Sequence, residues 1–142
     1  MYRHILIPTD GSELAEHGVA HGVALAKSLG AKVSVIFVVE PFPEITGRHL
    51  ETLARYVELR KEQATSVLNA AANAAKEAGV SCETIQVENV QPHQGIIATA
   101  EDKGCDLIVM SSHGRSGLSA LLIGSVTNKV LTHAKTPVLV CQ

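Results

Sequence analysis

Polar and glycine-rich residues follow two apolar segments of this chain, and they are the groups best suited to chemistry. Residues 8–12 read Pro-Thr-Asp-Gly-Ser, and residues 110–117 read Met-Ser-Ser-His-Gly-Arg-Ser-Gly. A third segment, residues 124–127, reads Gly-Ser-Val-Thr at the start of an expected helix. Glycines let backbone amides approach an anion, a helix N-terminus adds donors, and an arginine such as Arg115 binds phosphate through two hydrogen bonds. The combination favours phosphate binding, and the competing interpretation is a surface loop with a helix cap.

Predicted strands and helices alternate along the chain, and these elements must position the polar segments. Short runs rich in β-branched residues predict strands, and the longer stretches between them predict helices. The last two strands lack polar–apolar alternation, which is typical of a parallel sheet buried on both faces. We expect strands at residues 3–8, 32–39, 81–88, 107–110 and 137–141, and helices at residues 13–29, 49–78, 94–103 and 124–134.

The expected architecture is α/β, a three-layer open parallel sheet of five strands in the order 3-2-1-4-5 with helices on both faces. Ligands of such sheets bind beyond the carboxyl ends of the strands where the strand order reverses, here between strands one and four. Residues 8–12 and 110–117 follow these two strands. The two segments should therefore face each other across one crevice.

The first helix shows its signals most clearly. Ser12 is a natural N-cap, and Gly30 allows the left-handed turn that ends a helix. The polar face should carry residues such as His17 and His21. The apolar stripe expected to face the sheet consists of Ala15, Val19, Val23, Ala26 and Leu29.

Composition narrows the kinds of partner. The chain has 142 residues, a formal charge of −2, two Tyr, two Phe and no Trp. This length fits one domain over residues 1–142. The balanced charge and scarce aromatics argue against nucleic-acid binding, which needs phosphate neutralisation and base stacking. No apolar run is long enough for a membrane span or a signal-peptide core, so we expect a cytoplasmic protein without membrane contact.

Several other groups have simpler interpretations than a site. His17 and His21 have a metal-binding spacing, but no HExxH motif or third ligand accompanies them, so we expect an exposed face and no metal. The His113 side chain is able to donate a hydrogen bond to phosphate or to a neighbouring backbone carbonyl. We favour the second alternative, in which His113 holds the shape of the loop. Asp102 and Asp106 should lie at the amino end of the fourth strand, away from the crevice. The three cysteines, Cys82, Cys105 and Cys141, should pack as small apolar residues.

The glycine segments resemble a family motif. Residues 111–114, nine residues and then Gly124-Ser125 are similar to G-x2-G-x9-G-[ST], which nucleotide-binding universal stress proteins carry after the fourth strand. Residues 5–12 and 136–140 resemble the two ends of that family, so the chain is identified as a single-domain member of the ATP-binding-motif type. The implied fold is adenine nucleotide alpha hydrolase-like. One position departs, because Ser111 replaces the first glycine of the motif and would either crowd the backbone or add a donor.

The resemblance implies that the ligand is ATP, or else AMP or ADP, with or without Mg2+. Asp10 would hold the ribose, the backbone near Val38 would meet the adenine, and Gly114 and Arg115 would line the phosphates. It also implies a homodimer paired through the apolar edge strand Val138-Leu139-Val140. The complete implied nucleotide-binding set is Pro8, Thr9, Asp10, Val38, Met110, Ser111, His113, Gly114, Arg115, Ser116, Gly124, Ser125, Val126 and Thr127.

Three functions fit these residues: a regulatory or stress-response module that binds adenine nucleotide, a slow ATP hydrolase, and a dimeric interaction protein without a ligand. The chain has no GxxxxGK[ST] loop, and no second acidic residue is evident in the crevice to hold a metal or orient water. Nucleotide binding without efficient turnover, and without catalytic residues, is therefore favoured.

Overall fold

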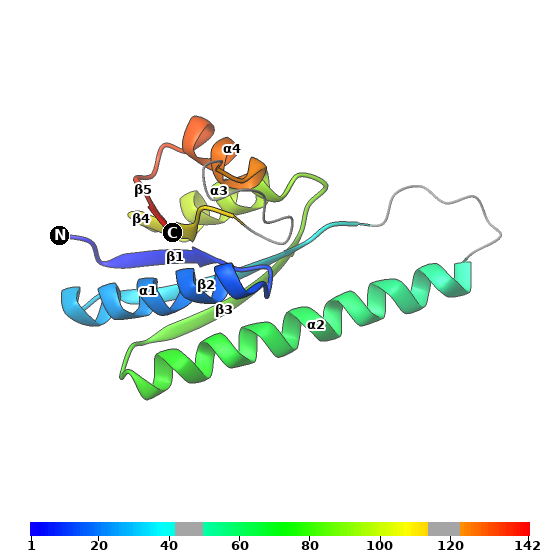
Figure 1. Ribbon diagram of the computed structural model, residues 1–142, viewed down its shortest axis with the longest axis horizontal. Helices are drawn as coiled ribbons and strands as arrows, with labels where there is room; N and C mark the ends of the chain where they lie inside the picture. Colours follow the sequence, from blue (N-terminus) through cyan, green and yellow to red (C-terminus); the bar gives the residue numbers. More distant parts are fainter. Residues whose placement is uncertain (42–49, 114–122) are drawn as a thin grey trace.

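A computed structural model describes residues 1–41, 50–113 and 123–142. Its five strands pair in parallel in the order β3-β2-β1-β4-β5, which confirms the predicted topology (Figure 1). The strands are β1 (His4–Pro8), β2 (Lys32–Val39), β3 (Cys82–Glu88), β4 (Leu107–Ser111) and β5 (Val138–Cys141). The helices are α1 (Glu13–Leu29), α2 (Leu50–Glu77), α3 (Pro92–Asp102) and α4 (Ser125–His133).

Figure 1 shows α1 and α2 on one face of the sheet and α3 and α4 on the other. One apolar cluster lies between the sheet and each of these pairs of helices. Ile5 and Ile7 of β1 pack toward α1 and α2, whereas Leu6 between them packs toward α3 and α4. This alternation follows from the two-residue period of a strand. Because both faces are covered, the central residues of β1 and β4 are apolar on both sides of each strand. The helical partners include Val19, Val23, Ala71 and Ala75 on the first face, and Ile96, Ala100 and Val130 on the second.

The ends of two helices differ from the expected ones for physical reasons. The predicted apolar stripe of α1 is confirmed except for Leu29, which is 39% exposed because the helix ends there and the chain turns at Gly30. Helix α3 begins at Pro92, two residues before its predicted start at 94, because the fixed φ of proline suits the first helical turn.

The amino end of the sheet is fastened by polar contacts. Asp106 accepts hydrogen bonds from the backbone amides of Arg3, at 2.9 Å, and His4, at 3.0 Å, and so ties the entry of β4 to that of β1. His4 Nε2 lies 2.7 Å from the hydroxyl of Ser34 on β2. These contacts lie at the end of β1 opposite to the expected crevice. Within the described residues, no helix is both long and apolar enough to span a bilayer.

Candidate functional site

The turn after β1 is held by its own side chains. The Thr9 amide donates to the Ile36 carbonyl at 2.9 Å, and Thr9 Oγ1 accepts from the Gly11 amide at 3.2 Å. Asp10 Oδ1 accepts from the Ser12 amide at 3.0 Å. Gly11 has φ +82°, and a side chain there would also meet Val67 of α2. The turn therefore holds the half-buried Asp10 at the carboxyl end of β1.

The segment after β4 is equally fixed. The Ser111 hydroxyl donates to the His113 carbonyl at 2.7 Å, and the Ser112 amide donates to Cys141 of β5 at 2.8 Å. The Ser112 hydroxyl lies 3.0 Å from His113 Nδ1, and both side chains are buried. Three consecutive residues are thus held against β5 and against one another.

Helix α4 begins next to this segment. The Gly124 amide donates to the Ser112 carbonyl at 2.6 Å, and the Thr127 hydroxyl donates to the Ser111 carbonyl at 2.9 Å. No side chain of the described residues caps α4, and its first internal bond runs from the Asn128 amide to the Gly124 carbonyl. The amides of the first turn are therefore donors at the positive end of the helix dipole, the arrangement that binds anions.

His113 supplies a further polar group at the same place. Only 5% of the residue is exposed, and its Nε2 atom has no hydrogen-bond partner in the described parts of the chain. When the Ser112 hydroxyl donates to Nδ1, Nε2 carries the proton and needs an acceptor. A buried donor without an acceptor is costly, so an entering anion would satisfy it.

The other predicted site residues lie at the ends of neighbouring strands. Pro8 closes β1, Val38 lies near the end of β2, and the buried Met110 lies near the end of β4. Gly95 of α3 packs tightly here, because a Cβ atom on it would lie 3.3 Å from Val38 Cγ2. The strand order thus places Val38 across β1 from Met110. The predicted phosphate residues Gly114, Arg115 and Ser116 lie outside the described residues.

Sequence reasoning missed two residues of this site. Ser112 connects β4, β5 and α4 through its amide, carbonyl and hydroxyl. Gly18 of α1 allows close approach, since a Cβ atom there would lie 3.2 Å from the Ser111 amide nitrogen. A glycine inside a helix costs about 1 kcal/mol relative to alanine. Gly18 and Gly22 in the middle of α1 were therefore a readable signal of close packing.

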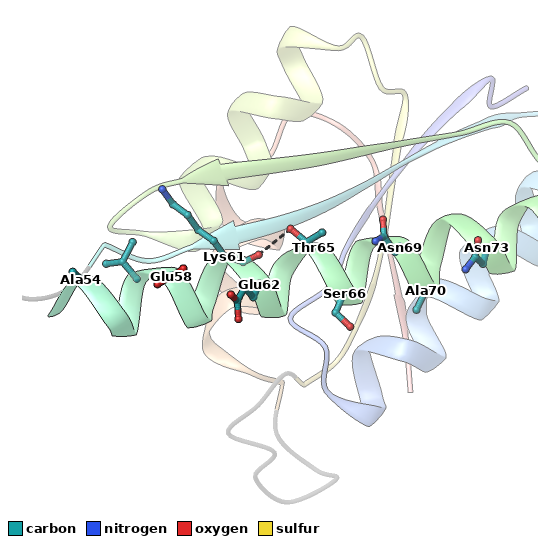
Figure 2. A pocket seen from close by; sticks show the side chains of 10 residues that line it. Ala54, Glu58, Lys61, Glu62, Thr65, Ser66, Asn69, Ala70 and Asn73 are labelled. Atoms are coloured by element: carbon teal, nitrogen blue, oxygen red, sulfur yellow. Dashed lines mark hydrogen bonds between the residues drawn. The ribbon is translucent and has the colours of Figure 1, made fainter. Parts of the chain in front are cut away.

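Two hollows lie elsewhere in the described residues. One follows the outer face of α2, where Lys61, Thr65 and Asn69 lie in a row (Figure 2). All of its lining residues come from that single helix, so it does not enclose a ligand. The other lies between α3 and α4 and includes Glu101, His93 and His133. No group of three or more potential metal ligands occurs among the described residues.

The cysteines form no disulfide and carry little thiolate. Cys105 is buried, and Cys82 and Cys141 are partly buried. Burial raises the pKa of all three thiols, to about 11 for Cys105. A raised pKa disfavours the reactive thiolate at neutral pH. These side chains therefore pack as apolar groups.

Comparison with known proteins gives a consistent result. The Universal stress protein family matches residues 1–142. Universal stress protein MJ0531 of Methanocaldococcus jannaschii is 37% identical over 142 residues, covering 100% of this chain and 83% of the relative. Universal stress protein UspA of Lactobacillus plantarum has the same fold, with a TM-score of 0.90 at 22% identity, covering 99% of this chain and 98% of the other.

Two solved structures with this fold hold nucleotides. A universal stress protein in complex with cAMP has a TM-score of 0.75 at 24% identity and covers 99% of this chain and 97% of its own. The universal stress protein of Archaeoglobus fulgidus in complex with dAMP has a TM-score of 0.71 at 22% identity, with coverage of 99% and 98%. The fold is the adenine nucleotide alpha hydrolase-like one that the sequence predicted. By its sequence along the whole length, the chain belongs to the universal stress protein family.

Proposed function

We propose that this protein binds an adenine nucleotide, with ATP as the favoured ligand, in a crevice between the ends of β1 and β4. In this proposal the protein acts as a regulatory stress-response module. The observation that carries the proposal is a group of hydrogen-bond donors for which the described residues supply no side-chain acceptor. The first-turn amides of α4 and the buried Nε2 of His113 lie on segments joined by the bond from Gly124 to Ser112. A phosphate group is the anion that such a group of donors suits.

The remaining residues fit the other parts of a nucleotide. The Asp10 carboxylate at the end of β1 is an acceptor for ribose hydroxyls. Val38 and Pro8, both partly exposed, offer aliphatic surface near the strand ends, which suits adenine in a chain with few aromatic residues. The cAMP and dAMP complexes support the class of ligand, because the same fold holds an adenine nucleotide in each. Arg115, with Gly114 and Ser116, is proposed to contact the phosphates, and Mg2+ to accompany them.

Nucleotide carried through purification tests the proposal. Native mass spectrometry and an acid extract of the purified protein should reveal ATP, ADP or AMP. After nucleotide removal, added ATP with Mg2+ should raise the melting temperature, because a ligand that binds only the folded state stabilises it. A protein that carries no nucleotide and melts at the same temperature with and without ATP, AMP and cAMP would contradict the proposal.

We also propose that two copies pair through β5. This strand lies at the edge of the sheet, and its central residue Leu139 is 37% exposed. An apolar strand with unpaired backbone groups on one side is a surface that another strand can cover.

A further inference from the structure

Ser111 stands where the family motif of the nucleotide-binding members has its first glycine, and its side chain already has a partner. Its hydroxyl donates to the His113 carbonyl at 2.7 Å, which closes a turn over residues 111–113. A hydroxyl has one proton to donate. The Ser111 side chain is therefore committed to the loop and has no second proton to donate to a phosphate.

The backbone of Ser111 is held from the other side as well. Its carbonyl accepts the Thr127 hydroxyl of α4 at 2.9 Å. Its amide nitrogen lies against α1, where a Cβ atom on Gly18 would be 3.2 Å away. The same Cβ atom would lie 3.6 Å from the Cβ atom of Ser111, so this side chain is placed next to α1. Ser111 thus lies between α1 and α4, with its hydroxyl directed along the loop.

The turn that this hydroxyl closes carries the donors of the site. His113 follows at its end, and its Nε2 atom has no hydrogen-bond partner among the residues that the structure describes. The Ser112 carbonyl within the turn accepts the amide of Gly124. Loss of the Ser111 hydroxyl would leave the His113 carbonyl without this partner and allow the turn to open. The Nε2 atom of His113 and the first-turn amides of α4 would then no longer be held in fixed positions relative to each other.

We propose that Ser111 is a positioning residue, which replaces the motif glycine by clasping the turn through the His113 carbonyl and so presents the donors of His113 and α4 to the phosphate. This inference rests on the proposed nucleotide site, and it identifies Ser111 as the residue that fixes the geometry of that site. Gly18 is the steric counterpart of Ser111, because a Cβ atom on Gly18 would lie 3.2 Å from the Ser111 amide nitrogen and would push α1 and Ser111 slightly apart.

The test compares variants of the full chain at position 111. Ser111→Ala and Ser111→Gly remove the hydroxyl, whereas Ser111→Thr keeps it. Ser66→Ala on the exposed face of α2 is the matched control. One hydrogen bond contributes about 0.5–1.5 kcal/mol net, so we expect Ser111→Ala to weaken ATP binding about two- to tenfold. Ser111→Thr should bind as the wild type does, and Ser111→Gly no more tightly than Ser111→Ala.

Amide hydrogen exchange in the nucleotide-free protein gives a second and independent result. The Gly124 amide should exchange several-fold faster in Ser111→Ala than in the wild type or Ser66→Ala, while the amides of β1 stay unchanged. Unchanged exchange at Gly124 would overturn the inference, and so would ATP binding in Ser111→Gly that equals or exceeds that of the wild type. A wild-type protein that binds no nucleotide would instead contradict the proposed function, and the exchange rates would still decide whether Ser111 holds the turn.

Discussion

At the start of α4, Gly124 has φ −60° and ψ 155°, an extended conformation that any residue adopts without strain. Gly124→Val therefore should not unfold the protein. Its side chain would occupy the cradle that the first-turn amides form, and we expect ATP affinity to fall more than tenfold. Titration with ATP and circular dichroism together check this outcome. Gly104→Asn, at the end of α3, is a control that should keep full affinity. Equal affinity in Gly124→Val would remove this helix end from the site.

Gly22 of α1 offers a residue-scale test of packing. A Cβ atom there would run into Ile7 of β1 and contact Val109 of β4 at 3.5 Å. Overpacking of a core costs about 1–3 kcal/mol. Alanine also gains about 1 kcal/mol over glycine inside a helix. We therefore expect Gly22→Ala to lower the free energy of unfolding in urea by the remainder, up to about 2 kcal/mol, whereas His21→Ala on the exposed face should change it little. A Gly22→Ala protein more stable than the wild type would show that the Ile7 side chain accommodates the added Cβ atom without cost.

For individual residues, the sequence predicted the residue types at a helix start better than the hydrogen-bond partners of those residues. The sequence predicted that Gly124 and Ser125 lie at a helix start, and α4 does begin there, because glycine and hydroxyl residues at such a position form a local signal. It did not predict that the Thr127 hydroxyl donates to the Ser111 carbonyl, or that Ser111 bonds His113. Those partners depend on how β4, α4 and α1 meet, which no local pattern contains.

At the scale of elements, α3 and α4 meet at a pair of histidines whose ring centroids are 5.9 Å apart, His93 and His133. Burial lowers the pKa of His93 below its usual 6.5, and the positive charges of Lys129 and of His133 lower it further. Glu101 lines the same hollow. The folded state therefore favours the neutral ring of His93. Its contribution to stability is complete above pH 6.5 and is lost as the pH falls from 6.5 toward the lowered value.

Urea unfolding at pH 7.5 and pH 5.5 measures this dependence. We expect the wild type to lose stability at the lower pH and His93→Gln to lose less of it. His21→Gln, on the exposed face of α1, should lose as much as the wild type. The pKa of His4 is also lowered by burial, so part of the loss should persist in His93→Gln. An equal loss in His93→Gln and the wild type would show that this histidine pair has no part in the pH response.

The elements were the most predictable level of the structure. Runs such as Leu107-Ile108-Val109-Met110 indicated doubly covered strands. The alternation of strands and helices, joined by right-handed crossovers, left few strand orders besides the one observed. The prediction that Leu29 faces the sheet was wrong, because periodicity alone does not show how far along α1 the core covers the helix. Local pattern predicts which face is apolar, and tertiary contacts decide how far along the helix it is covered.

For the whole molecule, the edge strand β5 predicts assembly. We expect sedimentation at micromolar concentration to show a dimer, and Leu139→Glu to shift it toward the monomer, because a charge on the exposed centre of β5 opposes pairing. Leu59→Glu is the matched control, since Leu59 is 51% exposed on α2 and lies outside β5. A wild-type monomer, or equal assembly of both variants, would contradict pairing through this strand.

The adenine nucleotide site proposed at the ends of β1 and β4 is tested most directly by calorimetric titration. ATP and AMP, with Mg2+, are added to the nucleotide-free wild-type protein and to Gly124→Val. We predict saturable binding with a stoichiometry of one per chain in the wild type and its loss in the folded variant. Absence of binding in the wild type, or the same binding curve in both proteins, would contradict an adenine nucleotide site at this place.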